Sequence, residues 1–142
     1  MKIFLGSEAD FVADKIISPF RTQISKQIDI LLSGKPANHY GTDITTFSII
    51  STCVSSDFLK DSNWKERIRY SKKDQTTDIR LKINYDELLS SSKDEQYQLY
   101  LHNIIESIHR FNLKYPDLDF KAKILIDDIT KISNDIQKTE IL

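Results

Sequence analysis

Several large classes of protein depend on residues that are scarce in this sequence. Cys53 is the one cysteine among 142 residues, which excludes an internal disulfide and a cysteine-rich zinc site. Three glycines form no Gly-rich phosphate loop, and no serine stands in a Gly-x-Ser-x-Gly motif. Phosphate-loop nucleotide hydrolases and serine hydrolases of the nucleophile-elbow type are therefore not expected.

Long apolar runs are also missing. The longest uncharged apolar stretch is far shorter than the ~20 residues that a membrane-spanning helix needs. Acidic residues at positions 8 and 10 interrupt the N-terminus before the apolar part of a signal peptide could form. We therefore expect a cytoplasmic protein with no membrane segment.

The composition is that of a globular domain, with 39% apolar and 29% charged residues. A chain of this length folds most often as one domain, so we expect residues 1–142 to form a single one. The net charge of −1 argues against a dedicated nucleic-acid binder, since phosphate binding needs a broad basic surface. The charge is nevertheless unevenly distributed: residues 60–85 carry eight basic and four acidic side chains, and residues 86–142 carry seven basic and eleven acidic ones.

Hydrophobic periodicity predicts seven elements in the order β-α-β-β-β-α-α. Residues 76–85 alternate most clearly, with Ile79, Leu81, Ile83 and Tyr85 facing one way and charged residues facing the other. Ser92 and Glu95 form a capping box at the start of a long helix that ends before Pro116. The expected strands cover 2–6, 44–54, 66–72 and 76–85, and the expected helices cover 10–32, 92–115 and 119–136.

This order predicts an α+β fold. Strands and helices are segregated after the first helix, so we expect a mainly antiparallel sheet of about four strands with three helices on one face. Lys73-Asp74-Gln75 joins two of the strands as a hairpin. Pro19 lies inside the first helix, and we expect a kink there because the apolar stripe of that helix keeps its phase across the proline.

Side chains with catalytic or metal-binding chemistry are few. Cys53 lies in an uncharged strand, where core packing is favoured over a nucleophilic role. His102, Glu106 and His109 share one side of a helix, but a polar helix surface is the better interpretation of this spacing. No catalytic residue, metal site or cofactor is predicted.

Two segments are candidates for binding. Gly6, Ser7 and Glu8 follow the first expected strand and precede a helix, and such a junction presents backbone N–H groups that can hold an anion. This supports an alternative function as a small nucleotide-binding or enzymatic domain, although a plain turn is favoured. The second segment is the outer side of the hairpin, which combines the side chains that most often anchor protein interfaces: Trp64, Arg67, Arg69, Arg80 and Lys82.

The whole pattern resembles a family of bacterial immunity proteins of polymorphic toxin systems, immunity protein 44. The likeness is carried by the start KIFLGSEADFVAD, by Tyr40-Gly41, and by the long apolar helix followed by Asp117-Leu118-Asp119-Phe120 and a final helix. Its most specific part is the hairpin RYSKK running into DIRLKINYD. The resemblance implies a protein that neutralises a cognate toxin by stoichiometric occlusion, without catalysis.

Two surfaces are available for such a toxin, and the sequence does not choose between them. One is the basic hairpin side, and the other is an acidic helical surface around Asp94, Glu95, Asp127 and Asp128. A nuclease toxin with a basic substrate cleft would prefer the acidic surface. Both are expected to be exposed.

Overall fold

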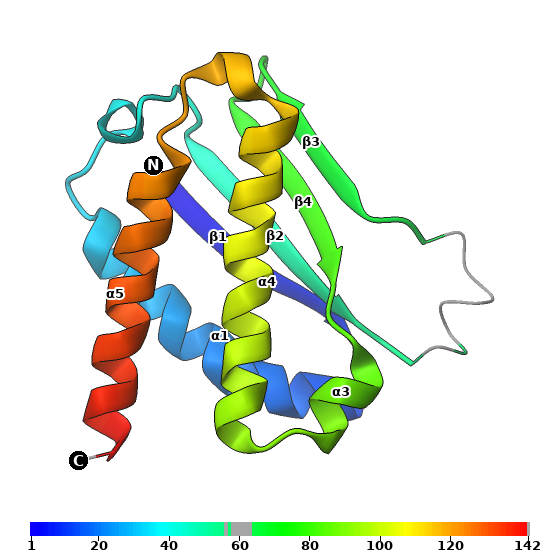
Figure 1. The fold of residues 1–142 in the computed structure, drawn as a ribbon. Coiled ribbons are helices and arrows are strands. Elements are labelled where there is room, and N and C mark those ends of the chain that lie inside the picture. Colours follow the sequence, from blue (N-terminus) through cyan, green and yellow to red (C-terminus); the bar gives the residue numbers. More distant parts are fainter. Residues whose placement is uncertain (56, 58–63, 142) are drawn as a thin grey trace.

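The structure is a computed structural model that describes residues 1–55, 57 and 64–141, with the side chains of residue 37 and of 133–141 left aside. One mixed sheet and four helices make up the described fold (Figure 1). The strands are β1 (Lys2–Ala9), β2 (Thr46–Cys53), β3 (Arg67–Ser71) and β4 (Thr76–Lys82). The helices are α1 (Phe11–Leu32), α3 (Tyr85–Ser90), α4 (Lys93–Lys114) and α5 (Ala122–Ile141), with short 3₁₀ turns at Ala37–Tyr40 and Pro116–Leu118.

The predicted α+β class is confirmed, but the predicted direction of the strands is wrong. In the strand order β1-β2-β4-β3, β1 is parallel to β2 and β2 is parallel to β4. Only β3 and β4 pair in the antiparallel manner that the hairpin predicts. Strands β1 and β2 are parallel because α1 is long enough to cross over and return the chain to the same end of the sheet. Strands β2 and β4 are parallel because β4 lies between β2 and its own antiparallel partner β3. Periodicity within a strand does not reveal its partner.

Strand β1 is longer than predicted. It continues through Gly6, Ser7 and Glu8 to Ala9, so the predicted turn at Gly6-Ser7 is wrong. The chain leaves the strand at Asp10, whose side chain accepts a hydrogen bond from the Ala13 N–H at 3.0 Å and caps α1. Helix α1 then continues past Pro19 to Leu32, so the proline does not end the helix, and the kink expected there stays a prediction.

Helix α3 was not predicted. Strand β4 ends at Lys82, three residues earlier than its alternating pattern suggests. The Asn84 side chain accepts a hydrogen bond from the Glu87 N–H at 2.9 Å and starts a six-residue helix. The capping box predicted at Ser92 and Glu95 is present at the start of α4.

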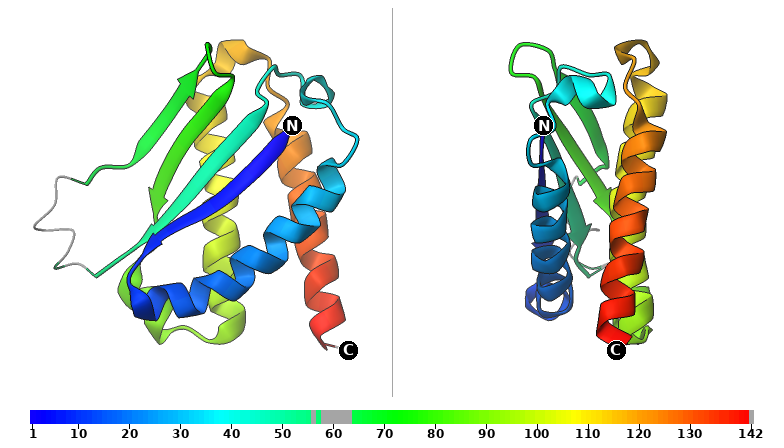
Figure 2. Two further views of the ribbon diagram at one scale, coloured as in Figure 1. Left: turned by 180° about the vertical axis from the view of Figure 1, so that it is seen from behind. Right: turned by 90° about the vertical axis from the view of Figure 1, so that its left-hand side faces the viewer.

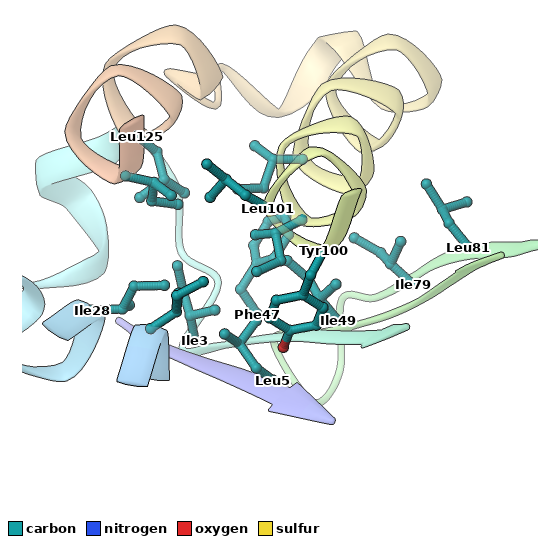
Figure 3. Close-up of a cluster of buried hydrophobic side chains, with 14 of the residues drawn as sticks. Ile3, Leu5, Ile28, Phe47, Ile49, Ile79, Leu81, Tyr100, Leu101 and Leu125 are labelled. Carbon is teal, nitrogen blue, oxygen red and sulfur yellow. The ribbon is translucent and has the colours of Figure 1, made fainter. Parts of the chain in front are cut away.

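The core lies between the sheet and the helices. Figure 2 shows α4 and α5 together on one side of the sheet, with α1 along the edge strand β1. In Figure 3, Tyr100 of α4 reaches toward the sheet, and Leu101 of α4 and Leu125 of α5 belong to the same cluster of buried side chains. Ile49 and Ile79 on the facing strands are fully buried. The predicted division of β4 into a buried and a solvent-facing side is confirmed.

The opposite side of the sheet is covered by no helix of the described chain (Figure 2). We call it the open face. Strand alternation and register place on it the side chains at every second position, beginning with Phe4 in β1 and Arg67 in β3. Its other members named below are Gly6, Glu8, Ser48, Ile50, Arg69, Asp78, Arg80 and Lys82.

Candidate functional site

A cleft of about 540 Å³ opens on this face. Its lining residues extend from β1 across β4 and β3 to the C-terminal end of α4. Its walls come from four parts of the chain, since Glu8 belongs to β1, Trp64 to the segment before β3, Arg80 to β4 and Lys114 to α4. The remaining lining residues are Lys65, Glu66, Arg67, Ile68 and Arg69.

Alternating charges cross the open face in a continuous row. Arg67 donates to Asp78 Oδ2 at 3.0 Å, and Arg80 Nε donates to Asp78 Oδ1 at 3.0 Å. The other end of the Arg80 guanidinium donates to Glu8 Oε1 at 2.6 Å. Because β2 lies between β4 and β1, the Arg80 side chain spans a whole strand to reach Glu8. We call these four residues the charge row.

The charge row changes the titration of its central acid. Partial burial alone would raise the pKa of Asp78, but hydrogen bonds from Arg67 and Arg80 and the charges of both guanidinium groups outweigh it. The pKa of Asp78 is therefore lowered from its ordinary value. A carboxylate that titrates lower in the folded chain than in the unfolded chain stabilises the fold above its unfolded pKa.

Replacing Asp78 with asparagine should therefore destabilise the protein in a pH-dependent manner. At pH 7 we expect the free energy of unfolding to fall by about 0.5–1 kcal/mol, the range for solvent-accessible ion pairs. The difference between wild type and Asp78→Asn should shrink as the pH falls below ~4, where the acid of the unfolded chain takes up its proton, and should vanish below the folded pKa. Urea unfolding of both proteins between pH 7 and pH 2 measures this, and a difference that grows on acidification would contradict the role given to Asp78.

The structure brings four of the five hairpin candidates together. Trp64, Arg67, Arg69 and Arg80 all line the cleft. Lys82 does not; it lies at the end of β4, beside a second cavity of about 270 Å³. Lys65 and Lys114 belong to the cleft but were not singled out from the sequence. Lys114 is a residue of α4 that donates a hydrogen bond to the Ile68 carbonyl, a contact that no spacing in the sequence indicates.

The acidic candidates lie elsewhere. Asp127 and Asp128 belong to α5, on the helical side of the sheet (Figure 2). The Tyr40 hydroxyl donates to Asp128 Oδ2 at 3.0 Å, and burial together with this bond raises the pKa of Tyr40 to about 12. Glu95 is held by Ser92 in the capping box. Asp128 and Glu95 thus bind other side chains of this protein. Asp94, Glu95 and Asp127 are exposed, and Asp128 is half-buried.

The segment Gly6-Ser7-Glu8 does not form the predicted strand-loop-helix junction. All three residues pair with β2, and the side chains of Ser7 and Glu8 bind Arg21 and Arg80. A Cβ at Gly6 would lie 2.6 Å from the Ile50 Cδ1 atom, so the missing side chain leaves room for Ile50 on the open face. The argument from free backbone N–H groups in a loop does not hold here, and anion binding by these residues stays an untested prediction.

The cysteine and the helix-surface trio of His102, Glu106 and His109 give no sign of a catalytic or metal-binding role in the described chain. Cys53 is fully buried, and burial followed by the nearby Asp10 charge raises the pKa of its thiol to about 12, which disfavours the nucleophilic thiolate. The predicted core role of Cys53 is confirmed. Within residues 1–55, 57 and 64–141, no group of three or more His, Cys, Asp or Glu residues is placed to hold a metal ion. Glu106, from the helix-surface trio, accepts instead from Arg110 at 3.0 Å.

Comparison with known protein families identifies a family for this chain. The model of the family described as immunity protein 44 matches residues 1–135. No curated protein and no solved structure matches the chain. In the described part of the chain, none of the helices combines the length and apolar character needed to span a bilayer.

Proposed function

The chain belongs to the immunity protein 44 family, and from this premise we propose that it neutralises a cognate bacterial toxin by binding it one-to-one and covering its working surface. The protein protects the bacterium that makes the toxin, as part of a polymorphic toxin system. It acts in the cytoplasm, and it inhibits by occupancy, without turning over a substrate.

The observation that carries this proposal is the extent of the family match, which spans residues 1–135 of 142. A match over both the sheet and the helices concerns the whole fold, not one shared motif. The burial and raised pKa of Cys53 also fit inhibition without a nucleophile.

The open face supplies a suitable surface for a protein partner. A specific complex buries about 1,600 Å² in total, and a few well-placed residues, often Trp and Arg, provide most of the binding energy. One tryptophan and three arginines lie together around the cleft. Charges on the rim of such a surface speed up association with an oppositely charged partner.

The proposal is tested by expressing this protein together with the toxin domain encoded by a neighbouring reading frame. We expect cells to survive toxin expression only when this protein is present, and the two chains to co-purify as a one-to-one complex. A toxin domain from an unrelated system serves as the control and should neither bind nor be neutralised. Death of the co-expressing cells, with both proteins folded, would refute the proposal.

A nucleotide-binding function is the second candidate. One observation favours it: β1 and β2 are parallel and are joined by the α1 crossover, as a nucleotide-binding domain of this kind requires. Neither described cavity, however, borders Asp10 or Phe11 at the start of α1. A thermal-shift panel of nucleotides distinguishes the two: a raised melting temperature would favour nucleotide binding, and flat curves would exclude it.

A further inference from the structure

We propose that the cleft on the open face binds an acidic segment of the toxin, with Arg69 as the main contact for a carboxylate. This inference rests on the proposed function, because the partner is the same toxin. It adds the chemical nature of the surface that is recognised and the side of the molecule that recognises it.

The first argument is the charge of the cleft walls. Five basic side chains line the cleft, compared with two acidic ones, Glu8 and Glu66, which leaves an excess of three positive charges. The basic side chains are Lys65, Arg67, Arg69, Arg80 and Lys114. A surface with this excess attracts an acidic partner and repels a basic one.

The second argument is that the carboxylates near the cleft already form ion pairs with other arginines. Asp78 gives one oxygen to Arg67 and the other to Arg80. Glu8 accepts from Arg80, and Glu66 accepts from Arg110 at 3.0 Å. These acids therefore neutralise Arg67, Arg80 and Arg110, and none of them forms an ion pair with Arg69.

Arg69 is available to bind a carboxylate of another protein. It lies directly opposite Asp78 in the β3–β4 register, yet both Asp78 oxygens bind other guanidinium groups. Within the described chain, Arg69 has no ion-pair partner and its side chain is exposed. A guanidinium group binds a carboxylate through two parallel hydrogen bonds, so an Asp or Glu of the toxin would continue the alternation of the charge row onto Arg69.

The third argument is that the site is organised before binding. Arg67 and Arg80 are held by two acids, so their side chains have less freedom to lose when a partner arrives. The acids of the charge row also disfavour a nucleic acid, since Glu8 and Asp78 would repel the closely spaced phosphates of its backbone. An acidic protein segment carries its charges on separate side chains, so it can direct one carboxylate to Arg69 and keep the others away from Glu8 and Asp78.

The test measures toxin binding by isothermal titration calorimetry for wild type and for Arg69→Glu. We expect the reversal to weaken binding by at least about 30-fold, because it removes a central charged contact and introduces repulsion. Lys123→Glu is the matched control, since Lys123 is an exposed basic residue of α5 on the helical side. It changes the net charge equally and should alter the affinity by less than about 3-fold. The neutral variant Arg69→Gln should give an intermediate loss, and thermal melting checks that all three variants fold.

The outcomes separate this inference from the proposed function. Tight binding by wild type with an unchanged affinity for both Arg69 variants would overturn the acidic-segment inference and leave the immunity function in place. Absence of binding by folded wild type would overturn both. A toxin acid whose reversal to lysine restores binding of Arg69→Glu would support the inference directly. Stronger binding of an RNA oligonucleotide than of the toxin, lost in Arg69→Glu, would overturn it in favour of a nucleic-acid surface.

Discussion

Replacing Phe111 with alanine is expected to lower the free energy of unfolding by about 3–5 kcal/mol. Phe111 is fully buried in α4, and its ring is the centre of an aromatic cluster. Ring centroids lie 5.1 Å away in Phe47 of β2, 6.3 Å away in Tyr70 of β3 and 6.1 Å away in Phe120, which precedes α5. Truncation removes contacts to three separate parts of the fold at once and leaves a cavity between the sheet and the helices.

The control is Leu113→Ala, two residues further along the same helix. Leu113 is 65% exposed, so its truncation should change stability by no more than about 0.5 kcal/mol. Urea unfolding of both variants measures the two effects under the same conditions. Equal losses in the two variants would show that the sheet does not pack against α4 through Phe111.

Replacing Asn103 with leucine is expected to destabilise the protein by about 2–4 kcal/mol, although leucine is similar in size and more apolar. Asn103 is a polar residue on the buried side of α4. It accepts a hydrogen bond from Ser51 Oγ in β2 at 2.6 Å, and its amide donates to the Leu81 carbonyl in β4 at 3.2 Å. Leucine would leave the Ser51 hydroxyl and the Leu81 carbonyl without these partners in the core.

A double-mutant cycle with Ser51→Ala tests this explanation. Ser51→Ala leaves the Asn103 side-chain oxygen without its donor, and Asn103→Leu leaves the Ser51 hydroxyl without its acceptor, whereas the double variant removes both members of this pair. The Leu81 carbonyl loses its amide donor in both variants that carry Asn103→Leu, so this loss cancels in the cycle. The double variant should therefore lose less stability than the sum of the single losses, by about 1 kcal/mol or more. Strictly additive losses would show that the two side chains do not interact in the folded protein.

The sequence was most informative where a single periodicity decided the structure. The alternation around Ile79 and Leu81 correctly predicted which side of β4 is buried, and it thereby placed Arg80 on the open face. The apolar spacing of the long helix predicts a stripe of six residues, of which Tyr97, Leu101, Ile104, Ile108 and Phe111 are buried in α4. The sixth, Tyr115, follows the helix and is half-buried.

Where two apolar residues are adjacent, periodicity could not choose between them. The apolar spacing of residues 10–32 favours a buried stripe of Phe11, Val12, Ile16, Phe20, Ile24, Ile28 and Leu31. Phe20, Ile24 and Ile28 are buried as this spacing predicts, but the other buried residues of α1 are Ala13, Ile17 and Leu32. Phe11 is instead 74% exposed and lies under the Lys15 ammonium group. The choice depends on how α1 meets β1, which is a property of the tertiary structure.

The same limit applies to the candidate site. The hairpin residues were predicted together because they are close in sequence, and four of them do line one cleft. Glu8 and Lys114 join them from distant parts of the chain, through the parallel pairing of β1 and through the end of α4. Glu8 was singled out for anion binding and not as a partner of Arg80, and Lys114 was not singled out at all, since a single lysine outside a motif is ordinarily a surface residue. Asp128 was likewise taken for a free acid because its partner Tyr40 lies 88 positions away.

The central claim is that this protein acts by occupying its partner, and a titration of toxin activity tests it most directly. Increasing amounts of the protein are added to a fixed amount of the cognate toxin domain, and the remaining activity and the mass of the toxin are measured. Inhibition by occupancy predicts a linear fall that reaches zero at one equivalent, with an unchanged toxin mass and full activity once the complex is dissociated. Complete inactivation by far less than one equivalent, or a toxin with an altered mass, would contradict the claim.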